Sequence, residues 1–279
     1  MPYKSIFTVL TDEKFAKTTL EHAAAFARAQ DAHLDALCLG LDRSQTGYYY
    51  AGATALVMEQ SLNLAREESR KLEKAAEDFL DNTEVRWGVE AGVTQMADLT
   101  RHVAARARFS DLVVMLKPYG EDRDVEMVAS VEAALFEAQT PVLVVPKNAE
   151  APGKPHTITI AWNESNEALR ATRAALPMLR DANLVRVVVI DPPTHGPNRS
   201  DPGGLLSQFL ARHGVRVEVD VISKTLPRVS DVLLRHTTDT NSDMIVMGAY
   251  GHSRFRESIL GGATRNMLER ATVPVLMAH

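Results

Sequence analysis

The sequence predicts an α/β protein built from two tandem copies of a doubly wound, open, parallel five-stranded sheet, a Rossmann-like architecture. Three observations support this fold class. Short β-branched runs alternate with longer helical patterns along the chain, which is typical of parallel strands joined by crossover helices. The apolar runs are nearly continuous, as expected for strands covered on both faces. The whole pattern occurs twice within the 279 residues.

The repeat is clearest in two pairs of segments. SDLVVM from Ser110 returns as SDMIVM from Ser242, and PVLVVP from Pro141 returns as PVLMAH from Pro274. Self-similarity at a fixed separation indicates a repeated structural module. The module predicted here is β-α-β-α-β-α-β-α-β, with right-handed crossovers.

Two domains follow from the repeat, one over residues 1–148 and one over 155–279, joined by the proline-containing segment 147–156. The strands expected in the first domain are 4–10, 33–40, 84–89, 111–116 and 142–146, and its helices are 14–29, 54–81, 94–108 and 124–138. The strands expected in the second domain are 157–162, 185–190, 215–221, 243–248 and 274–278, and its helices are 165–180, 203–213, 227–241 and 262–271.

The long second helix of the first domain is rich in charge. Its predicted apolar stripe contains Leu64, Leu72, Ala75, Ala76 and Phe79, with the charged residues on a solvated face. A face that binds a partner helix is the alternative interpretation.

Composition limits the function classes. The formal net charge of −5 argues against general nucleic-acid binding. The charge is unevenly distributed, with a net charge of −8 in residues 1–150 and +3 in residues 151–279, so the second half is the better host for an anion.

The single cysteine, Cys38, lies in an apolar run and is predicted to be a buried structural thiol. One cysteine excludes an internal disulfide and a thiolate zinc site. Without an apolar run of membrane-spanning length or a signal-peptide pattern, we expect a cytoplasmic protein with no membrane partner.

A glycine cluster follows the fourth strand of the second copy. Gly248 and Gly251 end that strand, and Gly261 and Gly262 precede the last helix. Backbone N–H groups at a helix N-terminus form a natural phosphate site, and three arginines add positive charge nearby, namely Arg254, Arg256 and Arg265. Neither of the common glycine-rich phosphate-loop patterns fits this segment.

The G-x2-G-x9-G spacing from Gly248, together with the tandem module, resembles the universal stress protein family in its two-domain form. The resemblance implies a stress-response protein that binds adenine nucleotide, ATP or AMP, in the second domain, with at most weak hydrolysis. The positions it implies at the ligand are Ala161, Asn163, Val189, Met247, Gly248, Gly251, His252, Gly261, Gly262, Ala263 and Thr264.

The resemblance also implies a role for each position. Met247 and Gly248 would lie beneath the ribose, and the backbone of Val189 would recognise adenine. The loop would turn at its glycines, and the phosphates would meet the start of the last helix at 263–264. His252 would face phosphate, although a solvent-facing loop histidine is the commoner case.

The sequence departs from the family pattern at two of these positions. Gly262 replaces a Ser or Thr, which removes a hydroxyl, and Asn163 replaces an Asp. A hydrogen bond contributes roughly 0.5–1.5 kcal/mol, so the lost hydroxyl would weaken binding by up to about tenfold. The lost carboxylate removes a ligand suited to Mg²⁺, and the participation of Mg²⁺ is left open.

The first copy lacks these features. Leu116 stands at the position of Gly248, and acidic residues follow it, namely Glu121, Asp122, Asp124 and Glu126. Acidic side chains would repel phosphate. We therefore predict that this domain has lost its nucleotide site and kept its fold.

Other interpretations stay open. Taken without the repeat, the glycines are equally compatible with plain turns; with it, a nucleotide or related anion site is favoured. Trp162 could stack on a ligand, but packing between sheet and helices is favoured. The closing strands of the two domains are expected to pair within the chain, and association into a homodimer is left open. The alternative function is a stress-response scaffold that binds no nucleotide. A nucleotide hydrolase or ligase is disfavoured because the sequence offers no catalytic triad or metal-ligand pattern.

Overall fold

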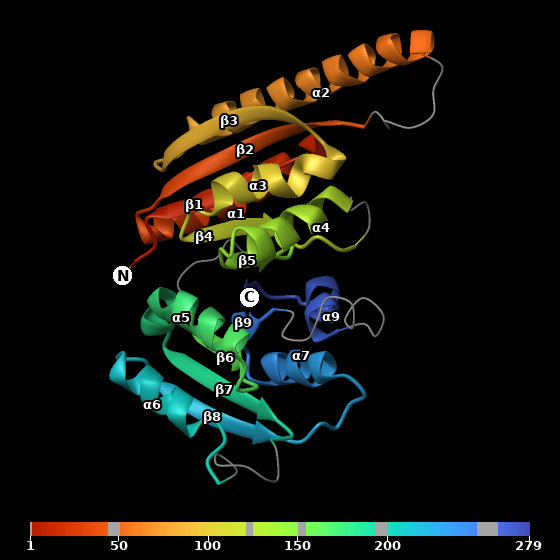
Figure 1. The fold of residues 1–279 in the computed structure, drawn as a ribbon. Helices are drawn as coiled ribbons and strands as arrows, with labels where there is room; N and C mark the ends of the chain where they lie inside the picture. The colour runs from red at the N-terminus through yellow and green to blue at the C-terminus, as the bar shows by residue number, and fades with distance from the viewer. Residues whose placement is uncertain (1, 44–50, 121–124, 150–154, 193–199, 250–261) are drawn as a thin grey trace. The chain divides into compact units, whose positions relative to one another are not determined.

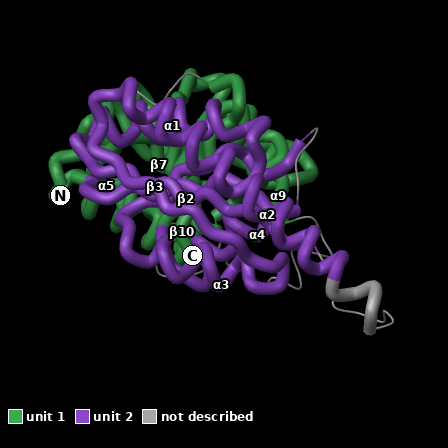
Figure 2. The backbone as a smooth tube through the Cα atoms, turned by 90° about the horizontal axis from the view of Figure 1, so that it is seen from above, with its two compact units in different colours: residues 1–2, 141–279 green, residues 3–140 purple. Residues whose placement is uncertain are grey.

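The computed structural model describes residues 2–43, 51–120, 125–149, 155–192, 200–249 and 262–279. The chain divides into two compact units (Figure 2): an N-terminal unit of residues 3–140, and a C-terminal unit of residues 141–279 with residues 1–2. The division falls a few residues before the linker expected at 147–156. Strands and helices alternate in both units, and the strand pairing is mostly parallel, which confirms the α/β fold class.

The N-terminal unit contains a parallel sheet in the order β3-β2-β1-β4. Its strands are β1 (Ser5–Leu10), β2 (His33–Asp42), β3 (Arg86–Gln95) and β4 (Leu112–Leu116). Its helices are α1 (Glu13–Gln30), α2 (Ala51–Leu80), α3 (Leu99–Ala107) and α4 (Val125–Glu132), with the short helical turns η1 (Met96–Asp98) and η2 (Ala133–Glu137). Helices α1 and α2 cover one face of this sheet, and α3 and α4 cover the other (Figure 1).

The C-terminal unit contains strands in the order β5-β10-β9-β6-β7-β8. These strands are β5 (Val142–Val145), β6 (Thr157–Ala161), β7 (Leu184–Ile190), β8 (Val217–Ile222), β9 (Met244–Gly248) and β10 (Val275–Ala278). The described helices are α5 (Asn166–Asp181), α6 (Gly204–Arg212), α7 (Val229–Asp239) and α9 (Ala263–Arg270). Figure 1 shows α5 and α6 on one face and α7 and α9 on the other.

The two closing strands pair with each other. Strand β5 is antiparallel to β10, with Val144 opposite Val275 and Val142 opposite Met277. This pairing agrees with the expectation for the closing strands, and β5 matches the strand expected at 142–146 and follows β4 in the sheet order, although by its contacts it groups with the C-terminal unit. All four residues of β5 are buried, and the pairing with β10 satisfies backbone groups that burial would otherwise leave without hydrogen bonds.

The Ser-Asp pair of the sequence repeat has the same structural role in both units. Asp111 Oδ2 accepts hydrogen bonds from the backbone N–H groups of Lys4 (2.7 Å) and Ser5 (3.0 Å). Asp243 Oδ2 accepts the same pair of bonds from residues 156–157, at 2.6 and 2.8 Å. Each carboxylate therefore joins the start of the fourth strand of its module to the start of the first, and the repeated motif is a structural clamp.

Removing one clamp is expected to destabilise its unit. In Asp243→Ala, two backbone donors lose a charged acceptor. We expect the free energy of unfolding to fall by about 1–2 kcal/mol, which is towards the low end for hydrogen bonds to charged groups because the site is exposed. Urea unfolding monitored by circular dichroism measures this loss. Asp239→Ala is the control, since Asp239 forms only an exposed pair with Arg235 at 3.6 Å and surface pairs contribute little. Equal losses in the two variants would contradict the clamp.

Helix α2 packs through a stripe that contains Leu72 and Ala76, as predicted, but not Leu64. Leu64 is 61% exposed, so its assignment to the buried stripe was wrong. The buried residues of the described part of α2 are Ala65, Ser69, Leu72, Ala76 and Leu80. With this face turned to the sheet, the backbone of α2 lies directly on β2 at Gly40. Any side chain at position 40 would collide with the carbonyl of Ala65.

Cys38 is fully buried on β2, next to α2. Burial, with smaller contributions from Glu73 and Glu77, raises the pKa of its thiol to about 12. The thiol is therefore protonated at neutral pH and unreactive, in agreement with the predicted structural role.

Strand β3 is longer than expected. It pairs with the whole length of β2, from Arg86 opposite His33 to Gln95 opposite Asp42, whereas the sequence suggested a strand ending at residue 89 and a helix from residue 94. Gly88 and Gly92 weaken the strand signal in the second half of this segment.

In the described part of the chain, no helix combines the length and apolar character needed to cross a membrane.

Candidate functional site

A cavity of about 550 Å³ lies at the carboxyl ends of β6, β7 and β9 in the C-terminal unit. Strand order reverses between β6 and β9, because the chain runs from β6 outward to β7 and β8 and then returns to β9 on the other side. Open α/β sheets bind ligands at this switch point. The described residues that line the cavity are Ala161, Trp162, Asn163, Ser165, Val188, Ile190, Val229, Ser230, Leu233, Met247, Gly248, Ala263, Thr264 and Met267.

The structure brings together most of the predicted ligand positions that it describes. Those in the lining are Ala161, Asn163, Met247, Gly248, Ala263 and Thr264. Val189 and Gly262 are described but are not part of the lining. Gly251, His252 and Gly261 lie outside the described residues, as do Arg254 and Arg256.

Val189 is buried on β7, and its side chain faces the α6 side, where it approaches Gly203. Because side chains alternate along a strand, its neighbours Val188 and Ile190 form the cavity wall. Gly262 is the residue before α9, with φ −57° and ψ 160°, a conformation open to any amino acid. Glycine at position 262 is therefore not required by the backbone.

Three helices begin at the cavity. Asn163 and Ser165 precede α5, Val229 and Ser230 are in the first turn of α7, and Ala263 begins α9. Helix N-termini carry partial positive charge and attract anions. The first turns of α5 and α7 contain an acidic residue, whereas the first turn of α9 contains none. The start of α9 is thus the strongest place for a phosphate.

The turn from β6 into α5 is held by its own side chains. Asn163 Oδ1 accepts a hydrogen bond from the backbone N–H of Ser165 (3.2 Å), and Ser165 Oγ accepts one from that of Ala168 (3.1 Å) as the N-cap of α5. Glu164 between them has φ +61°. Asn163 therefore has a local structural role at the cavity rim in addition to any contact with a ligand.

Gly248 is required by packing. A Cβ at this position would lie 2.6 Å from the backbone nitrogen of Ala168 and 2.8 Å from the carbonyl carbon of Glu167. A Cβ atom essentially never comes within 3.0 Å of a non-bonded atom, so only glycine permits α5 to lie this close to the end of β9. In the structure this glycine therefore permits the close approach of a helix.

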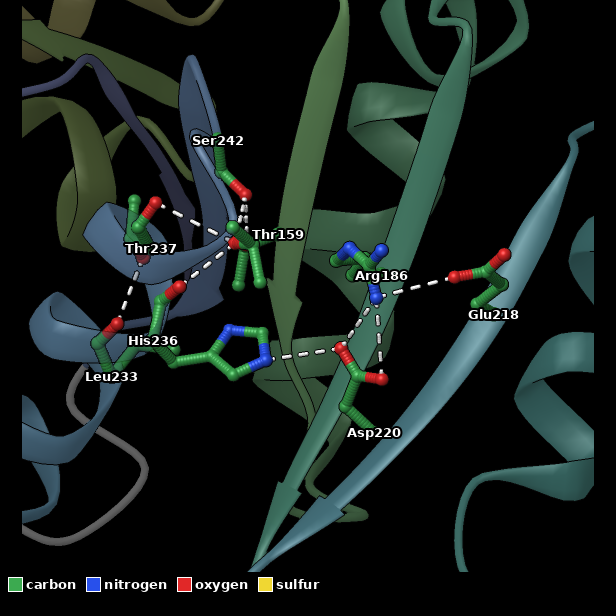
Figure 3. Close-up of polar contacts among 9 residues, drawn as sticks. Thr159, Arg186, Glu218, Asp220, Leu233, His236, Thr237 and Ser242 are labelled. Atoms are coloured by element: carbon green, nitrogen blue, oxygen red, sulfur yellow. Dashed lines mark hydrogen bonds and ion pairs between the residues drawn. The ribbon is translucent and has the colours of Figure 1, made fainter.

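Helix α7 is fixed to its surroundings at both ends. Figure 3 shows His236, near its C-terminus, directed at Asp220 of β8, with 3.0 Å between Nε2 and Oδ2; Arg186 of β7 bonds the same carboxylate at 3.1 Å. At its start, the side chain of Arg228 donates to Asn266 of α9 (3.3 Å), and Asp231 pairs with an arginine of α9. The wall that α7 presents to the cavity is therefore held in place.

Sequence analysis missed several lining residues, among them Ser165, Val188, Ile190, Val229, Ser230, Leu233 and Met267. The period-two pattern of β7 contains the signal for Val188 and Ile190, but it does not show which face borders the cavity. Trp162 is half-buried, and it lines this cavity and a neighbouring one between α5 and α6. It is thus placed to contact a ligand as well as to pack.

The corresponding position in the N-terminal unit is filled. Leu116, which replaces Gly248 in the repeat, is 1% exposed and packs with Phe15 and Met127. Glu126, one of the acidic residues expected to repel phosphate, is buried and pairs with Arg43 at 3.3 Å. The other three, at 121, 122 and 124, lie outside the described residues.

Comparison with known proteins agrees with this architecture. The family model described as "Universal stress protein family" matches residues 155–279. A curated relative, Universal stress protein Slr1230 of Synechocystis, is 26% identical over 153 residues, which are 53% of this chain and 50% of the relative. The aligned part of the chain thus spans about half the length of that relative.

Solved structures extend the likeness to the whole chain at the level of the fold. A universal stress protein from Archaeoglobus fulgidus DSM 4304 has a TM-score of 0.66 at 16% identity, covering 98% of this chain and 95% of its own. A protein from Pseudomonas aeruginosa UCBPP-PA14 has a TM-score of 0.59 at 13% identity, covering 99% and 93%. Residues 155–279 thus match the universal stress protein family, and these solved structures show the same fold over the whole chain.

Proposed function

We propose that the C-terminal unit binds an adenine nucleotide, ATP or AMP, in the cavity at the switch point of its strands, and that the protein acts in the stress response by changing shape or partners on binding. One observation carries the proposal: three helix N-termini and a largely apolar wall surround a single cavity of about 550 Å³. The helix N-termini suit an anion, and the apolar wall suits a base.

The proposed placement follows from the lining. The phosphates lie at Ala263 and Thr264, in the first turn of α9. The ribose lies over Met247 and Gly248 at the end of β9. Asn163 supplies an amide where the family pattern has a carboxylate, so we propose that Mg²⁺ enters with the nucleotide's own phosphates and adds little to the affinity.

The N-terminal unit does not share this function in our proposal. The Phe15–Leu116–Met127 cluster fills the position that corresponds to Gly248, so the end of β4 offers no equivalent space. We propose that this unit keeps the fold of the module and contributes packing. The expected stoichiometry is therefore one nucleotide per chain.

Calorimetric titration of ATP into the purified full chain, with and without Mg²⁺, tests the proposal. Ala263 is exposed at the first position of α9. In Ala263→Glu, a carboxylate at the phosphate position is expected to weaken ATP binding about tenfold or more. The same carboxylate would stabilise the helix start by about 0.3–1 kcal/mol, so weaker binding could not be ascribed to unfolding. Ala211→Glu, on the exposed surface of α6 outside the cavity, is the matched control and should bind like the wild type.

The outcomes separate the two candidate functions. Saturable binding that only Ala263→Glu weakens would support the nucleotide site. A folded wild-type protein that gives no heat with millimolar ATP would contradict it and leave the nucleotide-independent scaffold.

Gly262→Ser is expected to strengthen ATP binding by up to about tenfold, because it restores a hydroxyl at the start of α9. The backbone of residue 262 accepts serine without strain. Serine also caps helices slightly better than glycine, by a few tenths of a kcal/mol. Titration calorimetry measures the first effect and thermal unfolding the second. Unchanged affinity would show that the phosphates do not reach this residue.

A further inference from the structure

A buried hydroxyl in the cavity wall has no hydrogen-bond partner among the described residues. Ser230, in the first turn of α7, is 1% exposed, and its Oγ makes no hydrogen bond with any other described residue. Buried hydroxyls in proteins are almost always hydrogen-bonded, and an exception calls for an explanation. Because Ser230 also lines the cavity, a bound ligand is the natural partner for its hydroxyl.

The surroundings of Ser230 indicate which part of a ligand it meets. Strand β7 and helix α7 contribute Val188, Ile190, Val229 and Leu233 to the lining, all of them apolar. Ser230 is the single polar side chain that the described residues of these two elements place there. An apolar wall with one polar group suits a planar heterocycle, whose faces are apolar and whose edge is polar. A phosphate would gain nothing on this wall and is better placed at the start of α9.

The hydroxyl is held at a fixed position. Helix α7 is attached to β8 through His236 and Asp220, and to α9 through Arg228 and Asn266. The Cα of Ser230 therefore has little freedom, while the hydroxyl itself can rotate and can both donate and accept. The hydroxyl can therefore rotate to hydrogen-bond a donor or an acceptor on the edge of a ligand without any movement of α7.

We propose that Ser230 is a specificity-determining residue of the cavity, whose hydroxyl bonds the polar edge of the nucleotide base. This inference rests on the nucleotide site proposed above and adds to it a residue that reads the base. In the free protein the same hydroxyl is buried without a bond, which costs stability. Ser230→Ala is therefore expected to act in opposite directions on folding and on binding.

The experiment compares wild type, Ser230→Ala and Ser242→Ala, each titrated with ATP, adenosine and inorganic tripolyphosphate and each followed by thermal unfolding. Ser242 is the matched control, because it is also buried but its hydroxyl bonds Thr159 (2.8 Å) and Thr240 (2.9 Å), and it does not line the cavity. Ser230→Ala should weaken ATP and adenosine by the same factor, about two- to tenfold. It should leave tripolyphosphate binding unchanged and should not lower the unfolding midpoint. Ser242→Ala should lower the midpoint and leave all three affinities unchanged.

Three other results would each contradict a different part of the proposal. If wild type binds ATP and Ser230→Ala binds it equally well, Ser230 is not a ligand contact, although the nucleotide site stands. If Ser230→Ala weakens tripolyphosphate as much as ATP, the hydroxyl lies at the phosphate end and the base assignment is overturned. If folded wild type binds neither ATP nor adenosine, the nucleotide site fails and this inference fails with it.

Discussion

Replacing Gly40 with alanine is expected to lower the free energy of unfolding by about 3 kcal/mol, the upper end of the usual cost of overpacking. The added Cβ would lie 1.7 Å from the carbonyl oxygen of Ala65 and 3.1 Å from the backbone nitrogen of Ser69. These are backbone atoms of α2 and cannot rotate away. Helix α2 would have to lift from β2, which would stretch the bond from Ser69 Oγ to the carbonyl of Cys38, now 3.0 Å.

Equilibrium unfolding in urea measures this loss. Gly88→Ala is the control on the neighbouring strand β3, because the nearest atom to its Cβ is a side-chain oxygen of Asp35 at 3.0 Å, which can move. We expect the control to change stability by less than about 1 kcal/mol. Cys38 offers a second readout, since lifting α2 would expose the thiol to a labelling reagent. A Gly40→Ala protein of wild-type stability, with an unreactive thiol, would show that α2 does not pack this closely.

Gly248→Ala is expected to destabilise the C-terminal unit by about 1–3 kcal/mol. Its Cβ would meet the backbone of α5 at 2.6 Å, and α5 packs on β9 and β10. The start of α5 also borders the cavity through Ser165, so a shift of this helix should weaken ATP binding as well. Loss of stability and loss of affinity are thus expected together.

Thermal unfolding and calorimetric titration of the same samples check this prediction. The control is Gly204→Ala in α6, where the three atoms nearest to the added Cβ all belong to the exposed side chain of Asp201, which can rotate away, whereas the backbone of α5 cannot. It should leave the unfolding midpoint nearly unchanged. If Gly248→Ala keeps full stability and loses affinity alone, the glycine serves the ligand and not the packing of α5.

Much of the fold could be predicted from the sequence because local pattern and tertiary role agree. The apolar runs that become β4 and β9 are buried on both sides, and the strand-helix alternation leaves few alternative topologies. Two errors had a tertiary cause. The stripe of α2 is shifted from Leu64 to Ala65 because Gly40 lets the backbones meet, and β3 extends to Gln95 because β2 offers a full-length partner.

The candidate site was less accessible to sequence reasoning. The ends of β6 and β9 were identified because they lie at the glycine cluster and the repeated strand. Residues such as Ser230 carry no such signal, since they reach the cavity only through the way α7 lies against the sheet. Sequence also could not distinguish a glycine needed by a ligand from one needed by a neighbouring helix, as at Gly248, because both require close approach of the backbone.

Under the function proposed above, the filled position at Leu116 confines any effect of nucleotide concentration to the C-terminal unit. By linkage, a ligand that binds only the folded C-terminal unit would stabilise that unit by about 2.7 kcal/mol at one hundred times its dissociation constant. The N-terminal unit, whose Phe15–Leu116–Met127 cluster occupies the corresponding space permanently, would gain nothing. A fall in nucleotide level would therefore shorten the lifetime of one half of the molecule against proteolysis while leaving the other unchanged. Protein turnover would then follow the concentration of the nucleotide that this site binds.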